Sequence, residues 1–107
     1  MRTIGYRDTS FSLTASGTTQ ATALELIAQY NEVTTAASGS GVVLNSSLAY
    51  GDEQTVYNGG ANPLTVYPPT GMKINGLATN AGMLLATNTT CTFRWVSSTR
   101  IVGVLSA

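Results

Sequence analysis

The stretch NGGANPLTVYPPTGMKINGL, residues 58–77, places two turn sequences around one short apolar run. Asn58-Gly59-Gly60 opens the stretch, and two prolines end the run LTVY. Glycine readily adopts the positive φ of tight turns, and proline lacks the amide hydrogen that a strand ladder requires. We therefore predict two short strands, joined by a hairpin-like loop over residues 59–62 and ending at the prolines. Nothing in the stretch points to catalysis.

Short strand-like runs separated by turn signals continue on both sides of this stretch. The run TTCTFRWV alternates between two faces, one of which carries Cys91, Phe93 and Trp95. The run TSFSLTA alternates in the same way, with Phe11 and Leu13 on one side. A period of two residues is typical of strands. About eight to nine such runs in one domain favour an all-β fold, an antiparallel β-sandwich of the jelly-roll kind.

The run ATALELIAQYNEVTTA, residues 21–36, is ambiguous. Its first half is rich in helix-forming residues, and Leu24 and Ile27 have helical spacing. However, Leu24, Leu26 and Ala28 also alternate, and VTT is strand-like. We favour a strand and leave room for at most one short helix near residues 22–31.

Length and charge limit the class of protein. The chain has 107 residues, which is the length of one domain. Only 9% of the residues are charged, and five basic and five acidic residues cancel. A neutral surface cannot supply the counterion release that drives nucleic-acid binding, so we expect no nucleic-acid partner. Weak charge also protects poorly against association, so we expect copies of the chain or other partners to cover part of the surface.

Cysteine content and hydropathy indicate the cellular compartment in which the protein is made. Cys91 is the single cysteine, which excludes a disulfide framework within the chain. The sequence MRTIGYRDTS has no apolar core of the kind found in signal peptides, and no apolar run reaches the ~20 residues that span a bilayer. We expect a protein made in a cytoplasm, with no membrane partner.

The residues that usually carry chemistry are scarce. The chain has no histidine, which removes Ser-His and Cys-His nucleophilic pairs. Cys91 fits a small buried hydrophobe better than a nucleophile. Asp52 and Glu53 are neighbours, so in a strand they would face opposite sides rather than one cleft, and a solvated turn is favoured. We predict no catalytic site, no cofactor and no metal.

Four aromatic residues offer an alternative binding function. A platform for stacking sugars could be formed by Tyr50, Tyr57, Tyr67 and Trp95. Tyr57 and Tyr67 flank the predicted hairpin loop and could pair across it. Packing between strands, or an interface between subunits, is the favoured interpretation because tyrosine is enriched in both. The function of a carbohydrate-binding module is kept as an alternative.

The run from GVVLNSS to RWVSST resembles a family of small virion proteins of tailed bacteriophages. Members of the family tend to share a motif V-x-N-x-G-A-N-P-L-x-V-Y-P, followed by I-N-G-L-A-x-N-A. In this chain the matching residues are Val56, Asn58, Gly60, Ala61, Asn62, Pro63, Leu64, Val66, Tyr67, Pro68, residues 74–78, Asn80 and Ala81. The similarity covers roughly residues 20–100, and the N-terminal residues lie outside it.

The resemblance implies a non-enzymatic, strand-rich virion protein that is present in many copies. The role that fits best is a capsid decoration, or cement, protein, which sits over junctions between shell subunits. Its partners would then be the major capsid protein and further copies of itself, as a homotrimer or another homo-oligomer. The alternative is a component of the tail, the baseplate or a fibre tip, with an aromatic surface that contacts glycans.

Two segments are the candidate contact surfaces. Residues 1–10 could form an extended arm that adds main-chain hydrogen bonds to a neighbour. The arm would make its contacts through Met1, Arg2, Thr3, Ile4, Gly5 and Tyr6. The final strand is a candidate edge for self-association, formed by Arg100, Ile101, Val102, Gly103, Val104 and Leu105. Gly103 lacks a side chain and would let another backbone approach closely.

Overall fold

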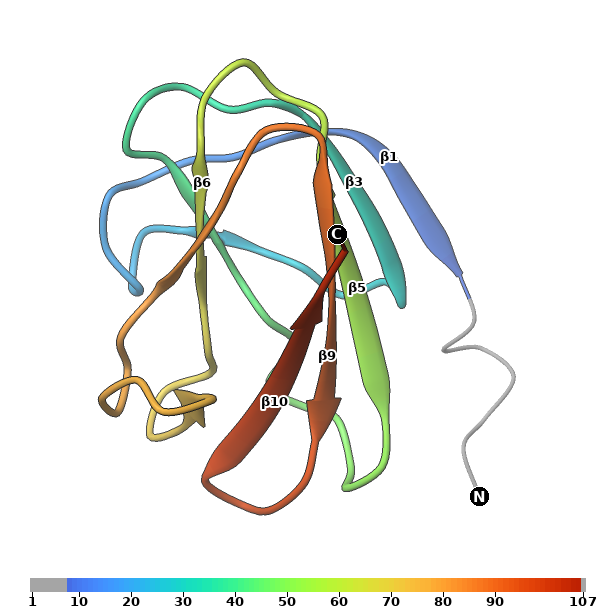
Figure 1. The fold of residues 1–107 in the computed structure, drawn as a ribbon, viewed down its shortest axis with the longest axis vertical. Helices are drawn as coiled ribbons and strands as arrows, with labels where there is room; N and C mark the ends of the chain where they lie inside the picture. Colours follow the sequence, from blue (N-terminus) through green and yellow to red (C-terminus); the bar gives the residue numbers. More distant parts are fainter. Residues whose placement is uncertain (1–7, 107) are drawn as a thin grey trace.

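The computed structural model describes residues 8–106, which form ten strands and no helix (Figure 1). The strands are β1 (Thr9–Thr14), β2 (Leu24–Glu25), β3 (Tyr30–Thr35), β4 (Gly41–Val43), β5 (Glu53–Asn58), β6 (Leu64–Tyr67), β7 (Lys73–Ile74), β8 (Met83–Leu85), β9 (Thr89–Trp95) and β10 (Arg100–Leu105). A six-stranded sheet has the order β1-β3-β5-β9-β10-β7, and a four-stranded sheet has the order β2-β4-β6-β8. The prediction of an all-β fold is confirmed.

The first six strands alternate between the two sheets. Within each sheet, successive strands pair in parallel: Tyr30 lies opposite Thr55, and Gly41 lies opposite Thr65. Parallel strands need a crossover connection, and here each crossover is a strand of the other sheet. The chain therefore winds through successive coils of a short β-solenoid.

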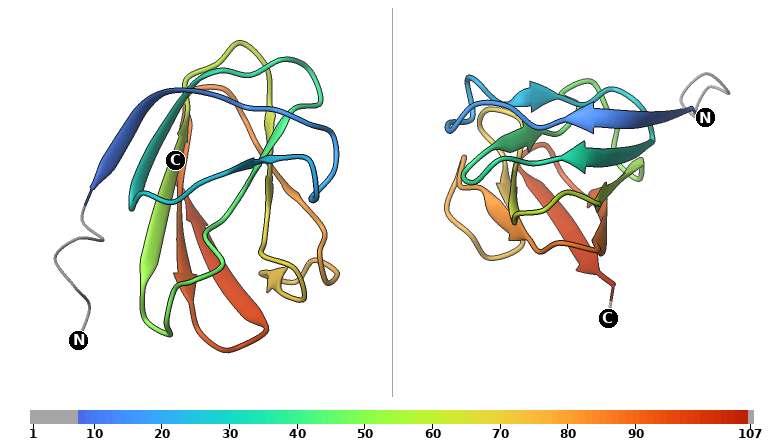
Figure 2. Two further views of the ribbon diagram at one scale, coloured as in Figure 1. Left: turned by 180° about the vertical axis from the view of Figure 1, so that it is seen from behind. Right: turned by 90° about the horizontal axis from the view of Figure 1, so that it is seen from above.

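Antiparallel strands complete the far end of the stack. Strand β8 pairs with β6, and β9 lies antiparallel between β5 and β10. Strand β7 adds a short parallel pairing to the outer side of β10. The view from above in Figure 2 shows β1 and β2 at the opposite end, where each is the edge strand of its sheet.

The prediction of an antiparallel jelly roll is wrong for most strand pairs, and the predicted hairpin is wrong for the same reason. Strands β5 and β6 lie in different sheets, so residues 59–63 form a corner of a coil rather than a hairpin loop. A strand with one buried face has the same period of two in a hairpin and in a coil, so alternation could not distinguish them. The helix considered near residues 22–31 is also absent: this segment holds β2 and the start of β3.

The core lies between the two sheets. The prediction for β9 is confirmed, because Cys91, Phe93 and Trp95 are all buried. Apolar side chains from both sheets and from the residues that directly follow β2 and β4 complete the core: Leu26, Val33, Val42, Leu44, Val56, Leu64, Val66, Ile74, Leu85 and Ile101. Burying such side chains is the main favourable term in folding.

Strand β1 departs from regular alternation. Phe11 is 63% exposed, whereas Leu13 packs against the core. The register with β3 shifts between Ser10 and Leu13, and Ser12 between them has φ 58°. The shift is a bulge, which changes the direction of side chains along a strand. The expectation that Phe11 and Leu13 share one side is therefore wrong.

Two buried amide side chains lie near the ends of β5. The Nε2 group of Gln54 donates to the carbonyl oxygens of Leu26 and Ala28, at 3.2 and 2.9 Å. Its Oε1 accepts a hydrogen bond of 2.9 Å from the backbone amide of Asn45. One side chain thus joins the corner after β2 to the corner after β4.

Asn58 joins a corner to another strand in a similar way at the other end of β5. Its Nδ2 group donates to the carbonyl oxygens of Asn62 and Leu85, at 3.0 and 2.9 Å, and its Oδ1 accepts from the Gly60 amide at 2.9 Å. A Cβ atom on Gly60 would lie 2.8 Å from Ala36, so the corner is closed tightly. Asn62 extends the network by donating to the carbonyl oxygen of Ala36 at 2.9 Å.

The Gln54→Met variant tests this arrangement. Methionine fills a similar volume but leaves two carbonyl groups and one amide without the partner that Gln54 provides. A buried polar group that loses its partner costs about 1–3 kcal/mol, so we expect the free energy of unfolding to fall by about 2 kcal/mol or more. Urea denaturation measures this change. The control is Thr34→Ala at an exposed position of β3, which should stay within about 0.5 kcal/mol of the parent. A Gln54→Met protein as stable as the parent would contradict the account.

Candidate functional site

The outer face of the six-stranded sheet carries polar, aromatic and aliphatic side chains from four neighbouring strands, β3, β5, β9 and β10. Cross-strand pairing sets one row across it, in which Thr55 lies opposite Tyr30 and Thr92, and Thr92 lies opposite Val104. We name this surface the outer sheet face, and its residues are Tyr30, Glu32, Glu53, Thr55, Tyr57, Thr90, Thr92, Arg94, Val102 and Val104.

Strict alternation along β5 and β9 builds this face. In β5 the residues Gln54, Val56 and Asn58 are buried, so the three residues between and before them point outward. The outward positions hold threonine and tyrosine, which suit a pleated surface that is half-buried. The same sequence pattern that fills the core therefore places hydroxyl and aromatic groups outside.

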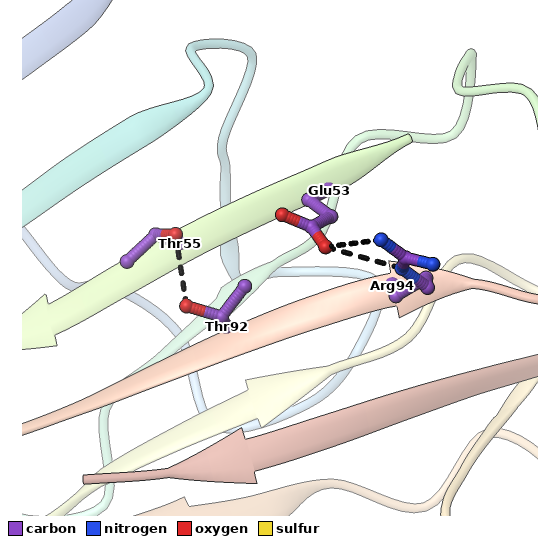
Figure 3. A network of polar contacts seen from close by, with 4 residues as sticks. All are labelled: Glu53, Thr55, Thr92 and Arg94. Atoms are coloured by element: carbon purple, nitrogen blue, oxygen red, sulfur yellow. Dashed lines mark hydrogen bonds and ion pairs between the residues drawn. The ribbon is translucent and has the colours of Figure 1, made fainter. Parts of the chain in front are cut away.

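Four polar side chains of the outer sheet face pair across strands β5 and β9 (Figure 3). The Nε and Nη2 groups of Arg94 both donate to Oε2 of Glu53, at 3.1 and 2.8 Å. The hydroxyl groups of Thr55 and Thr92 lie 3.2 Å apart. The ion pair is exposed to solvent, and such pairs contribute only about 0–1 kcal/mol to stability. Its main effect is to fix the position of two long side chains.

Both tyrosines of the face are also fixed by hydrogen bonds. The Tyr30 hydroxyl donates to Oε1 of Glu32 at 3.1 Å, and the Tyr57 hydroxyl donates to Oδ1 of Asn88 at 3.2 Å. Partial burial, and then the hydrogen bond to Glu32, raise the pKa of Tyr30 above its ordinary value. Tyr30 therefore remains a neutral donor at physiological pH.

The arrangement supplies contact surface rather than a reactive group. Each carboxylate of the face already accepts a hydrogen bond from a neighbour, Glu32 from Tyr30 and Glu53 from Arg94. Within residues 8–106, no group of three or more Cys, Asp and Glu side chains could hold a metal ion. The same residues contain no helix long and apolar enough to cross a membrane. Ordered hydroxyl and aromatic groups are suited to binding another macromolecule by complementarity.

The predicted arm lies mostly outside the described residues. Met1, Arg2, Thr3, Ile4, Gly5 and Tyr6 all precede the first described residue, Asp8. Thr9 and Ser10, which were assigned to the arm, belong instead to strand β1. Strand β1 pairs with β3 on one side only and forms the edge of the six-stranded sheet.

The predicted self-association edge lies in β10, which has neighbours on both sides. Along one side, residues 101–105 pair with β9; on the other, Arg100 and Ile101 pair with β7. A Cβ atom on Gly103 would lie 3.0 Å from Sγ of Cys91 and 3.1 Å from the Phe93 ring. On the side to which a side chain would point, the space at Gly103 is therefore filled from within the chain. Association of copies through β10 stays a prediction.

The four aromatic residues considered as a sugar platform do not come together. Tyr57 lies on the outer sheet face, whereas Tyr67 lies in β6 of the other sheet and donates its hydroxyl to the Thr18 carbonyl at 3.1 Å. Trp95 is only 2% exposed, and Tyr50 is 67% exposed in the loop after β4. Pairing of Tyr57 with Tyr67 across a hairpin is thus wrong. Sequence reasoning did not count Tyr30 among the candidate aromatic residues, because its segment fitted both a strand and a helix.

Cys91 behaves as a core residue. It is completely buried, and burial raises the pKa of its thiol from 9.0 to about 11 although a backbone hydrogen bond at Val104 opposes the shift. The thiolate is the reactive form of cysteine, so this side chain is poorly suited to nucleophilic chemistry. The Asp52 carboxylate accepts a hydrogen bond of 3.0 Å from the Ala49 amide and closes the turn before β5.

Comparison with known proteins adds no relative: no protein-family model matches the chain, and no curated protein is significantly similar to it in sequence. The function is therefore inferred from the residues and their arrangement. The outer sheet face and the two edge strands at the start of the solenoid are the surfaces to which such an inference can refer.

The raised pKa of Cys91 predicts how stability depends on alkaline pH. At neutral pH the thiol is protonated in both the folded and the unfolded state, so its contribution to the free energy of unfolding is constant there. Between pH 9 and 11 the unfolded state loses the proton first, so the free energy of unfolding should decrease as the pH rises. Urea denaturation at a series of pH values between about 8 and about 11 measures this decrease in the free energy of unfolding.

The matched variant is Cys91→Ala, which removes the thiol and retains the tyrosines. Its stability should decrease less steeply over the same range, although the smaller side chain lowers stability at every pH. The prediction is contradicted if the free energy of unfolding falls with pH at the same slope in the parent and in Cys91→Ala. Equal slopes would show that burial does not raise the pKa of this thiol.

Proposed function

We propose that the protein is a decoration, or cement, protein of a tailed-bacteriophage capsid. It binds the outside of the shell formed by the major capsid protein and stabilises the assembled particle without catalysing a reaction. The resemblance of residues 56–81 to phage virion proteins supports this role. The structural observation that carries it is the outer sheet face, a broad and weakly charged surface whose polar groups are already ordered.

Ordered surface side chains favour this kind of binding. A face whose side chains are fixed before binding loses less conformational entropy when it meets a partner. Tyr30 and Tyr57 provide the aromatic contact area that is enriched at protein interfaces, and the threonines between them provide hydroxyl groups. A protein that binds only the assembled shell stabilises it by mass action, and many copies multiply the effect.

The N-terminal residues are proposed as a second contact with the shell. The chain leads from residues 1–7 directly into β1, the edge strand of the six-stranded sheet. A segment attached to a sheet edge can pair with a neighbouring sheet by strand addition. In the particle the protein would thus use both a face and an extended segment.

A component of the tail, the baseplate or a fibre tip is the second candidate. Exposed aromatic side chains favour it, because Phe11 and Tyr50 are 63% and 67% exposed and aromatic rings stack on sugars. Copy number distinguishes the two roles. Several hundred copies per virion, counted by quantitative mass spectrometry, indicate the shell, whereas a handful indicates the tail.

The Thr92→Arg variant tests the role of the outer sheet face. Thr92 lies at the centre of the face, and an arginine there would place an unpaired charge in the proposed contact. We expect co-sedimentation with shells of the same phage's major capsid protein to weaken by about tenfold or more. The control is Leu84→Arg, at an exposed position of β8 on the other sheet, which should bind as the parent does. If only the Leu84→Arg control lost binding, the contact would lie on the four-stranded sheet. That result would refute the proposed role of the outer sheet face.

Deletion of residues 1–7 tests the arm separately. This deletion leaves β1 complete, whereas deletion of residues 1–10 would remove its first two positions. We expect the shortened protein to fold with an unchanged melting temperature and to be lost from shells during washing. Full retention of the shortened protein on shells would refute a role for the arm.

A further inference from the structure

Asn75 lies where β7 ends beside the outer side of β10. Its backbone amide donates to the carbonyl oxygen of Ile101 at 2.8 Å. Its side chain then reaches further along the strand: Oδ1 accepts from the Gly103 amide at 2.9 Å, and Nδ2 donates to the Gly103 carbonyl at 3.4 Å. The side-chain amide thus offers β10 the donor and the acceptor that the next peptide group of a neighbouring strand would offer.

Alternation along β10 defines which residues direct their main-chain N–H and C=O groups away from β9. The amide of Ser106 donates to Thr90, and the carbonyl of Arg100 accepts from Val96, so even-numbered residues form their main-chain bonds toward β9. Ile101, Gly103 and Leu105 therefore direct their main-chain groups to the opposite side. Asn75 occupies the first two of these positions, and among the described residues only Leu105 is left for a strand of another chain.

The outer side of β10 would otherwise suit pairing with a second copy. Its last residues, VGVL, carry no charge, and Val104 and Leu105 are 67% and 54% exposed. An uncharged edge without proline or lysine is a template for pairing with another chain. Two copies of one strand can pair antiparallel about a two-fold axis, and a chain with a formal net charge of +0 offers little repulsion.

We propose that the side chain of Asn75 guards this edge and prevents β10 from pairing with β10 of a second copy. The backbone at Asn75 has φ 52°, a left-handed conformation that glycine and asparagine adopt most readily. Of these two residues, only asparagine also brings an amide to Gly103. The interaction surface predicted for the final strand is thus present but closed, and copies that associate do so through another surface.

The Asn75→Gly variant tests the guard. Glycine keeps the left-handed backbone and removes the amide, so Gly103 and Leu105 become two successive open positions. Sedimentation velocity over a range of concentrations should show a species of twice the parent's mass that increases with concentration. The control is Asn88→Gly, which changes another left-handed asparagine, with φ 63°, whose side chain contacts Tyr57 rather than β10. Its mass should equal that of the parent.

A second change locates the new contact. Adding Val104→Lys to Asn75→Gly places like charges opposite one another in the paired strands, which should restore the parent's mass. The proposal is overturned if Asn75→Gly keeps the parent's mass at every concentration. It is also overturned if the double variant still forms the species of twice the parent's mass.

The parent protein provides a test that does not depend on the folding of a variant. Because Asn75 binds Gly103, the amide hydrogen of Gly103 should exchange with solvent far more slowly than that of Leu105. Equally fast exchange of the two amides in NMR spectra would show that Asn75 leaves the edge open.

Discussion

The fold depends on two buried amide side chains, Gln54 and Asn58, that bind the corners of the solenoid from opposite ends of β5. Each coil must turn twice to pass between the sheets, and every turn exposes backbone groups that cannot pair within a strand. Buried backbone groups need partners, so a small solenoid without helices must supply them from side chains. Gln54 joins the corners after β2 and β4, and Asn58 joins the corner after β5 to β8. With the corners closed, the apolar inner faces can pack to form one core.

This constraint gives a structural role to the motif of residues 56–68, which carries the proposed resemblance to phage virion proteins. Asn58, Gly60 and Asn62 belong to this motif, and all three build one corner. In this chain the motif therefore closes one corner of the scaffold. Under the proposed function, contacts with a partner would lie on the surfaces that the scaffold carries. The surfaces proposed for such contacts are the outer sheet face and the edge strand β1.

Local structure could be predicted from the sequence, whereas topology could not. Alternation in β9 correctly placed Cys91, Phe93 and Trp95 in the core because a period of two reports one buried face. The same period occurs in hairpins and in coils, so the parallel order of the first six strands left no signal in the alternation. The available clue to the solenoid was that two polar residues, Gln54 and Asn58, occupy inward positions of β5. They were overlooked because a buried amide has a clear meaning only when its partners are known. The contact of Asn75 with Gly103 joins distant segments and could not be found from spacing.

Hydrogen exchange of the native protein tests most directly whether the buried amides hold the corners together. The informative groups are the backbone amides of Asn45 and Gly60, which donate to Gln54 and Asn58 although both lie outside the strands. The account predicts that these two amides exchange as slowly as those of β9, because the corners open only when the whole domain unfolds. Exchange at the rate of an exposed loop would show that the corners open on their own, and would contradict the account.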